Sequence, residues 1–159
     1  QHGCVIPESL VDEIFGKLST DVAGGGRASY QIVGIGRRQV ARHVAAARRA
    51  GLRFNYLLNA ACLDNLEFTR SGQKDLRALL DWCVDIGVEA VTVASPFLLR
   101  IVKERHPRLR ARVSVFACID HVRQAKMWEE LGDDCLMLDS LLVNREFRLL
   151  KAIRESVRC

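Results

Sequence analysis

Short apolar runs alternate with longer amphipathic stretches from one end of the chain to the other. Five of the apolar runs have the length and composition of β-strands, namely residues 11–18, 54–58, 90–94, 110–118 and 135–138. Three of these runs follow a glycine that is placed to end the preceding helix, namely Gly51, Gly87 and Gly132. We therefore predict a strand, a loop and a helix repeated five times, with residues 157–159 beginning another strand.

The stretches between these runs have the period of an α-helix. In residues 75–87 the apolar positions form one stripe, made of Leu76, Leu79, Leu80, Cys83, Val84 and Ile86. In residues 144–157 a second stripe is made of Phe147, Leu150, Ile153 and Val157. Both stripes are predicted to pack on the core.

Strands that alternate with helices indicate a parallel sheet joined by right-handed crossovers. Units of about 30 to 40 residues suit a (β/α)8 barrel, in which about 250 residues make eight units. The predicted fold class is therefore α/β, a partial (β/α)8 TIM-like barrel with about five β–α units of parallel sheet. An open doubly wound sheet is the alternative. We expect residues 1–159 to form a single α/β domain, the N-terminal part of a longer barrel protein.

Polar residues gather where the predicted strands end. Because loops that follow parallel strands open onto one face of a barrel, these residues are predicted to share a ligand site. The candidate ligand-binding residues are Gly24, Gly25, Gly26, Arg27, Asn59, Asn65, Asn144 and Arg145. The glycines would let the backbone approach a ligand, and Arg27 would hold an anion or a carboxylate. For Asn59 and Asn65, the alternative is a hydrogen bond within their own loop.

Other polar residues of these loops have a structural explanation beside a functional one. Ser95 and Asp120 are predicted helix N-caps. Cys118 and His121 have the spacing of metal ligands, but two residues do not fill a metal shell. Cys62 or Cys118 would serve as a nucleophile only beside a base, and nothing in the sequence positions one.

Two phosphate-binding motifs are not matched. Gly34 and Gly36 follow a strand-like run, but Gln39 stands where a dinucleotide-binding fingerprint has its third small residue. The acidic residue expected near the end of the next strand is also missing, since Asn55 and Asn59 are found there. The glycine triplet lacks the Gly-Lys-Ser/Thr of a P-loop.

The composition, 49% hydrophobic and 27% charged, is typical of a soluble globular domain. No apolar run reaches the roughly 18 residues of a membrane helix, and no export signal is visible, so we expect a cytoplasmic protein with reduced thiols. The net charge is +5, and much of the excess lies in residues 100–112. This basic run indicates either a nucleic-acid patch or the polar end of a helix with a solvated turn, and no aromatic residue interleaves it.

Several segments stand in order along the chain, namely IFGKL with DVAGGGRASY, GLRFNYLLNAACLDNLEFTRSGQ, GVEAVTVASPFLLRIVKERHP, VSVFA and LDSLLVNREFRLLKAIRESVRC. Together they resemble the N-terminal half of the collagenase-like peptidase family, peptidase family U32. The most specific parts are FNYLLNA, TVASP and NREF. The likeness begins near Val11 and covers nearly all of the remaining chain.

The resemblance implies a barrel-like fold within a longer parent protein. Members of this family are described as proteases, some as collagenases, without agreed catalytic residues. Relatives take part in the hydroxylation of transfer RNA or ribosomal RNA, or in oxygen-independent quinone hydroxylation. Several of them carry a [4Fe–4S] cluster. Cys159 is similar in place to the first ligand of that cluster, and the other ligands would follow it. This chain alone is expected to hold no cluster, which needs about four thiolates.

Two classes of function are consistent with these observations. The first is part of an enzyme site, for a peptidase or for iron–sulfur-dependent hydroxylation of RNA or a small aromatic by the full-length protein. Glu67 and Asp139 are its candidate catalytic residues, provided that the fold brings them together, since no Ser-His-Asp or HExxH motif is visible. The second is a non-catalytic binding or assembly module that a partner completes. Exposed sheet edges would favour a homo-oligomer or a paired subunit.

Overall fold

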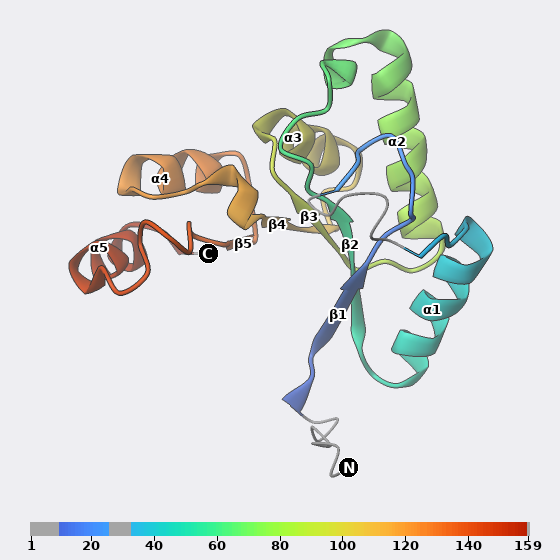
Figure 1. The fold of residues 1–159 in the computed structure, drawn as a ribbon, viewed down its shortest axis with the longest axis horizontal. Helices are drawn as coiled ribbons and strands as arrows, with labels where there is room; N and C mark the ends of the chain where they lie inside the picture. Colours follow the sequence, from blue (N-terminus) through green and yellow to red (C-terminus); the bar gives the residue numbers. More distant parts are fainter. Residues whose placement is uncertain (1–9, 26–32, 159) are drawn as a thin grey trace.

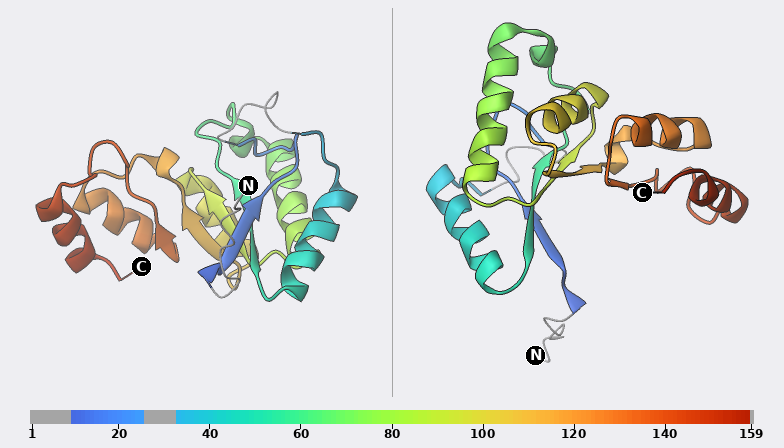
Figure 2. Two further views of the ribbon diagram at one scale, coloured as in Figure 1. Left: turned by 60° about the horizontal axis from the view of Figure 1, so that its bottom comes forward. Right: turned by 180° about the vertical axis from the view of Figure 1, so that it is seen from behind.

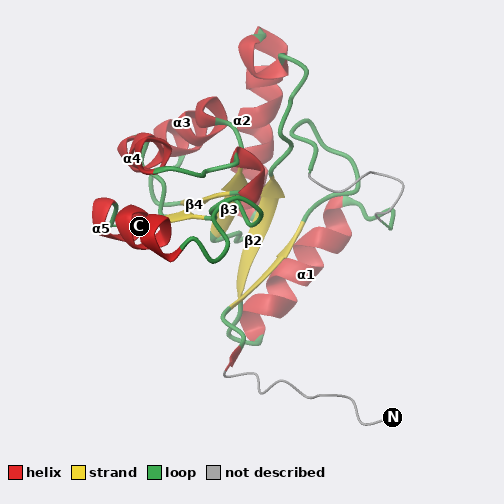
Figure 3. Cartoon of the chain, turned by 60° about the vertical axis from the view of Figure 1, so that its left-hand side comes forward, coloured by secondary structure: helices red, strands yellow, loops and turns green. Residues whose placement is uncertain are grey.

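The computed structural model describes residues 10–25 and 33–158 of the chain, in which strands alternate with helices (Figures 1 and 3). The strands are β1 (Glu13–Gly16), β2 (Arg53–Leu58), β3 (Ala90–Val93), β4 (Arg110–Val113) and β5 (Cys135–Leu136). The α-helices are α1 (Arg37–Arg49), α2 (Arg70–Asp85), α3 (Pro96–Arg105), α4 (Val122–Glu130) and α5 (Phe147–Ser156). Two short 3-10 helices are η3 (Leu66–Phe68) and η4 (Val115–Ala117). In these ranges, no helix has the length and apolar character needed to cross a membrane.

The five strands form one parallel sheet in the order β1-β2-β3-β4-β5. Each strand pairs with its neighbour in the sequence, so the order lacks the reversal that characterises a doubly wound sheet. Right-handed crossovers then place the connecting helices on one side, and the helices follow the sheet in an arc from α1 to α5 (Figures 1 and 2). The fold is α/β with a barrel-like order of parallel strands, as predicted.

One side-chain contact indicates how strongly the sheet curves. Arg112 of β4 donates a hydrogen bond to Glu13 of β1 at 2.9 Å, although β2 and β3 lie between these strands. In a flat sheet, β1 and β4 would be about 14 Å apart, which is three strand spacings. The contact therefore indicates that the sheet bends toward the side without helices, as a barrel wall does.

The core lies between the convex side of this sheet and the helices. The strand residues in it are at most 5% exposed and include Phe54, Tyr56, Leu58, Val91 and Val93. From the predicted stripe of α2, the fully buried residues are Leu76, Leu79, Leu80 and Cys83. Burial raises the pKa of the Cys83 thiol well above its usual range, so this cysteine is a small, protonated core residue.

Three residues of the predicted stripes, Val84, Phe147 and Leu150, do not belong to the core, so their predicted packing on it was wrong. Leu149 packs against the core in place of Leu150. Val84, near the end of α2, is 38% exposed because it borders a groove that Leu109 also lines. Phe147 is the first residue of α5 and is 75% exposed. Helical periodicity identifies the apolar face of a helix, but it does not show where along the helix the neighbouring layer stops.

Helix ends agree with the prediction at most positions. Positive φ angles of 75°, 90° and 91° are found at the helix-closing glycines Gly51, Gly87 and Gly132. Ser95 caps α3 by accepting a hydrogen bond from the amide of Leu98. Asp120 does not cap α4, because His121 occupies the N-cap position and the Asp120 carboxylate bonds the ring of His121 at 2.5 Å instead.

The last strands are shorter than predicted. β4 ends before Ser114, because the Ser114 hydroxyl accepts a hydrogen bond from the amide of Phe116 and begins η4. β5 consists of two residues only. Residues 157 and 158 form no strand, so the predicted sixth strand does not begin there, and Cys159 lies outside the described residues.

Candidate functional site

The loops that leave the five parallel strands share one edge of the sheet, which we call the carboxyl rim. It consists of residues 17–25, 59–69, 94–95, 114–121 and 137–146. The predicted site residues that lie on it are Gly24, Gly25, Asn59, Asn65, Glu67, Asp139, Asn144 and Arg145. Gly26 and Arg27 fall outside the described residues. The rim is the edge at which barrels of this kind place their sites.

A buried polar pair lies at the centre of the carboxyl rim. Asn59 follows β2 directly, and its Nδ2 donates a hydrogen bond to the Oγ of Ser114 at 3.3 Å. Only 9% of Asn59 and 2% of Ser114 is exposed, so the pair ties the end of β2 to the end of β4. Sequence analysis missed Ser114 because it placed this residue inside a longer strand; a serine directly after a buried valine was the available signal for a turn.

The first rim loop is held by a buried ion pair. Lys17 Nζ lies 3.2 Å from the carboxylate of Asp21, and both side chains are under a tenth exposed. Asp21 also accepts a hydrogen bond of 2.7 Å from the hydroxyl of Tyr56, which in turn accepts one from the amide of Leu18. Burial, together with the charge of Asp21, raises the pKa of Tyr56 far above its usual range, so this phenol stays a neutral donor.

The same lysine explains why glycines follow. Lys17 Nζ also donates to the carbonyl of Gly24, which has a φ of 56°. A Cβ at Gly25 would lie 2.8 Å from Cδ of Lys17, and one at Gly24 would lie 3.3 Å from Cβ of Ala60. The two glycines therefore allow a close approach to the protein's own side chains, and their contact with a ligand stays a prediction.

The two candidate catalytic carboxylates lie in loops that leave strands three positions apart in the sheet, and no hydrogen bond joins them. They also differ in their partners. Asp139 Oδ1 accepts hydrogen bonds from the amides of Leu141 and Leu142, at 2.7 and 2.8 Å. Glu67 Oε2 is buried and has no hydrogen-bond partner among residues 10–25 and 33–158. Glu67 thus has an acceptor oxygen that no described residue occupies, whereas Asp139 stabilises its own loop.

The remaining candidates of the rim are exposed. Asn65 precedes η3 in the left-handed conformation, with a φ of 61°. Asn144 and Arg145 lie in the loop after β5, and Arg145 also has a positive φ, of 68°. Non-glycine residues in this conformation carry backbone strain, which is found more often at functional sites than elsewhere.

The thiols of the rim belong to no group of three metal-binding side chains among the described residues. Cys62 and Cys118 are both exposed, on the loops after β2 and β4. The Cys118 thiol contacts the carbonyl of Phe116 at 3.7 Å, and His121 bonds Asp120, so no cysteine–histidine pair is formed here. Within the described part of the chain, no three His, Cys, Asp or Glu residues are grouped so that they could hold a metal ion.

A second polar group, which sequence analysis missed, lies on the concave side of the sheet. Asn55 of β2 donates to Glu13 of β1 at 2.9 Å and accepts from Thr92 of β3 at 3.0 Å. Arg112 of β4 completes the layer through Glu13. Asn55 and Thr92 are only 3% and 2% exposed, so four neighbouring strands are joined by one buried and two partly buried hydrogen bonds. The available signal was the alternation of polar and apolar residues in RFNYLL and RARV.

Residues 27–155 match the family model described as Peptidase family U32. The chain belongs to peptidase family U32. The resemblance inferred from the sequence segments is thereby confirmed.

Two relatives of the family bear on the fold and on the length of the chain. This U32 chain is 30% identical over 120 residues to an uncharacterized protease, MJ1657, from Methanocaldococcus jannaschii; the match covers 76% of this chain and 35% of that protein. The solved structure of the U32 peptidase Mk0906 is similar with a TM-score of 0.79 and 26% identity, over 96% of this chain and 60% of that chain. The chain thus spans about a third of the length of the curated relative.

A likeness outside the U32 family concerns the fold alone. Deoxyribose phosphate aldolase from Aeropyrum pernix is similar with a TM-score of 0.54 at 15% identity, over 87% of this chain and 69% of that chain. The U32 chain therefore shares its α/β arrangement with an enzyme of a different name, and function has to be argued from its own residues.

Proposed function

We propose that this chain forms part of a hydrolytic site for peptide substrates on the carboxyl rim, with Glu67 as the acid–base group. Membership in peptidase family U32 supports the substrate class. The observation that carries the assignment of Glu67 is its buried Oε2, which lacks a hydrogen-bond partner among the described residues. Buried acceptors are nearly always paired, so an unpaired one on the rim of a barrel is a candidate for contact with substrate or with the attacking water.

In this proposal, Glu67 removes a proton from the water that attacks the peptide carbonyl and returns a proton to the leaving amine. A positioned acid–base group contributes roughly 10²- to 10⁴-fold to such a reaction. Asn65 lies two residues earlier in the same loop and would contact the substrate, together with Asn144 and Arg145 from the loop after β5. Asp139 then has a structural role, because its Oδ1 is occupied by backbone amides.

Iron–sulfur-dependent hydroxylation of RNA or a small aromatic is the competing proposal, favoured by the net charge of +5 and by the place of Cys159. The described residues do not fit the cofactor, because no three of their His, Cys, Asp and Glu side chains are grouped to hold a metal. A [4Fe–4S] cluster would need thiolates from outside the described residues.

The experiment measures peptide hydrolysis and iron content in the full-length protein. Glu67→Gln should lower kcat about 100-fold or more with little change in KM, because it keeps the shape of the side chain and removes its basicity. Glu104→Gln is the matched control, since Glu104 is exposed on α3 and away from the rim. It should retain full activity.

The outcomes separate the proposals. Hydrolysis by iron-free protein that depends on Glu67 supports the peptidase. Protein that contains stoichiometric iron and does not cleave peptides supports hydroxylation instead. A protein with neither property would be the binding or assembly module.

A further inference from the structure

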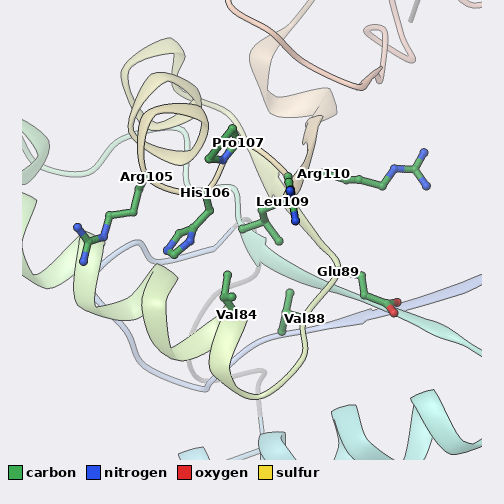
Figure 4. Close-up of a pocket in the computed structure, with 9 residues that line it drawn as sticks. Val84, Val88, Glu89, Arg105, His106, Pro107, Leu109 and Arg110 are labelled. Carbon is green, nitrogen blue, oxygen red and sulfur yellow. The ribbon is translucent and has the colours of Figure 1, made fainter.

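A groove of about 650 Å³ lies at the opposite edge of the sheet from the carboxyl rim. We call it the lower groove. Residues of the last turn of α2, of the loop before β3 and of the 105–110 segment line it, namely Val84, Val88, Glu89, Arg105, His106, Pro107, Arg108, Leu109 and Arg110 (Figure 4). Its volume is in the range of ligand-binding pockets. No part of the proposed peptidase site lies here.

The middle of the lower groove is apolar. Val84 and Val88 face Pro107 and Leu109 across it (Figure 4). Val88 and Leu109 are each 5% exposed and form the floor, while Val84 remains 38% exposed on the wall. An exposed valine beside an apolar floor offers surface that a partner's apolar side chain would cover.

The cations beside this floor come from the basic run that the sequence raised as a nucleic-acid patch. Most of that run is neutralised within the fold, by the ion pairs Arg100–Glu104, Lys103–Asp134, Arg105–Asp81 and Arg112–Glu13. Arg108 and Arg110 form no ion pair with any described residue. The uncompensated positive charge of the run therefore borders the lower groove, and no Phe, Tyr or Trp side chain for base stacking lines it.

Glu89 contributes a hydrogen-bond acceptor to the lower groove, in contrast to the cationic Arg108 and Arg110. Its Oε2 is buried and has no hydrogen-bond partner in the part of the chain that the structure describes. Burial of an acceptor without a donor is unfavourable, so an occupant that brings an N–H group to this edge would be stabilised. Asp81 does not repel an anionic occupant, because Arg105 and His106 already bind its carboxylate, at 2.7 and 2.8 Å.

We propose that the lower groove docks an extended peptide segment of a partner protein, with an apolar side chain next to an acidic one. The apolar side chain covers Val84 and Leu109, the carboxylate pairs with Arg108 and Arg110, and a backbone N–H reaches Glu89. A peptide supplies these three features together, whereas nucleic acid supplies only the anion. The proposal does not rest on the proposed peptidase function, because the two surfaces lie at opposite edges of the sheet.

The test uses fluorescence anisotropy of full-length protein with a labelled, acetylated peptide of sequence Leu-Val-Asp-Asp-Leu. The double variant Arg108→Gln, Arg110→Gln should weaken binding roughly tenfold or more. Replacement of both aspartates of the peptide by asparagine should weaken it by a similar factor. Arg123→Gln, an exposed arginine of α4, is the matched control and should bind as the wild type does.

A second variant addresses the apolar part independently. Val84→Asn removes apolar surface from the exposed wall without adding a charge that would repel the acidic peptide, and it should weaken binding roughly tenfold or more while the protein stays folded by circular dichroism. The proposal is overturned if the peptide does not bind at millimolar concentration, if the Arg123 control loses binding equally, or if a single-stranded RNA binds through Arg108 and Arg110 while the peptide does not.

Discussion

At the scale of residues, the carboxylates of this protein differ in whether their oxygens are already occupied. Asp21 is bound by Lys17 and Tyr56, and Asp139 by two backbone amides. Glu67 keeps a buried oxygen without a partner among the described residues. The first two carboxylates stabilise loops, and the third is the one that we propose to contact a ligand. Another carboxylate with bound partners is Asp81, and its effect on the free energy of unfolding can be measured.

Asp81 contributes stability that depends on pH. Its hydrogen bond with Arg105, and then that with His106, lowers the pKa of the carboxyl from 3.8 to about 2. Because the pKa in the folded state is the lower one, the contribution is complete above the unfolded value of 3.8 and is lost as the pH falls through about 2. The side chain is 37% exposed, so solvent screening limits the contribution to less than about 1 kcal/mol.

Asp81→Asn should therefore lower the free energy of unfolding slightly at neutral pH, and the deficit should shrink toward zero as the pH falls below 3.8. Urea denaturation at a series of pH values measures this. Asp85→Asn is the control, since Asp85 is exposed on the same helix and forms no ion pair with a described residue. A deficit that stays constant down to the lowest pH would contradict the assignment.

At the scale of elements, the ends of helices were predicted better than the ends of strands. A helix-closing glycine is a local signal, and all three predicted glycines have positive φ. The end of β4 depends on a turn made by Ser114, and the pairing of Ser114 with Asn59 joins residues 55 positions apart. The concave polar layer was missed for the same reason, because its partners come from four different strands.

A substitution at Gly51 tests whether a helix-closing glycine is needed for its positive φ angle. Gly51 closes α1 with a φ of 75°, and no atom lies within 4 Å of the place that a Cβ would take. Gly51→Ala should lower the free energy of unfolding by about 1 to 2 kcal/mol, from backbone conformation alone.

Gly34→Ala is the matched control for that variant. Gly34 also has open space at its Cβ position but is not in the left-handed conformation, so the substitution should change stability by less than about 0.5 kcal/mol. Urea denaturation compares the two variants. Equal losses would show that the φ angle is not the cause.

At the scale of the whole molecule, the curvature of the sheet brings side chains of its first and fourth strands into contact. Glu13 and Arg112 are 15% and 18% exposed and meet across β2 and β3. The repeat of strand and helix was enough to predict the parallel order and the common rim. It was not enough to predict which rim residues act together, because that depends on side-chain reach and on the curvature itself.

Arg112→Gln should lower the free energy of unfolding by about 2 to 4 kcal/mol, because it leaves Glu13 largely buried without its cation. A double-mutant cycle with Glu13→Gln should give a coupling energy of at least about 1 kcal/mol. Arg123→Gln serves as the exposed control. A coupling energy near zero would contradict the role of this pair in joining β1 to β4.

The most direct test of the proposed peptidase site compares two carboxylates of the same rim in one peptide-hydrolysis assay. Full-length protein with Glu67→Gln should lose about 100-fold or more in kcat. Protein with Asp139→Asn should keep most of its kcat and lose stability instead, because it weakens the capping of the loop after β5. If Glu67→Gln retains the activity of the wild type, Glu67 is not the acid–base group and the proposed site is wrong.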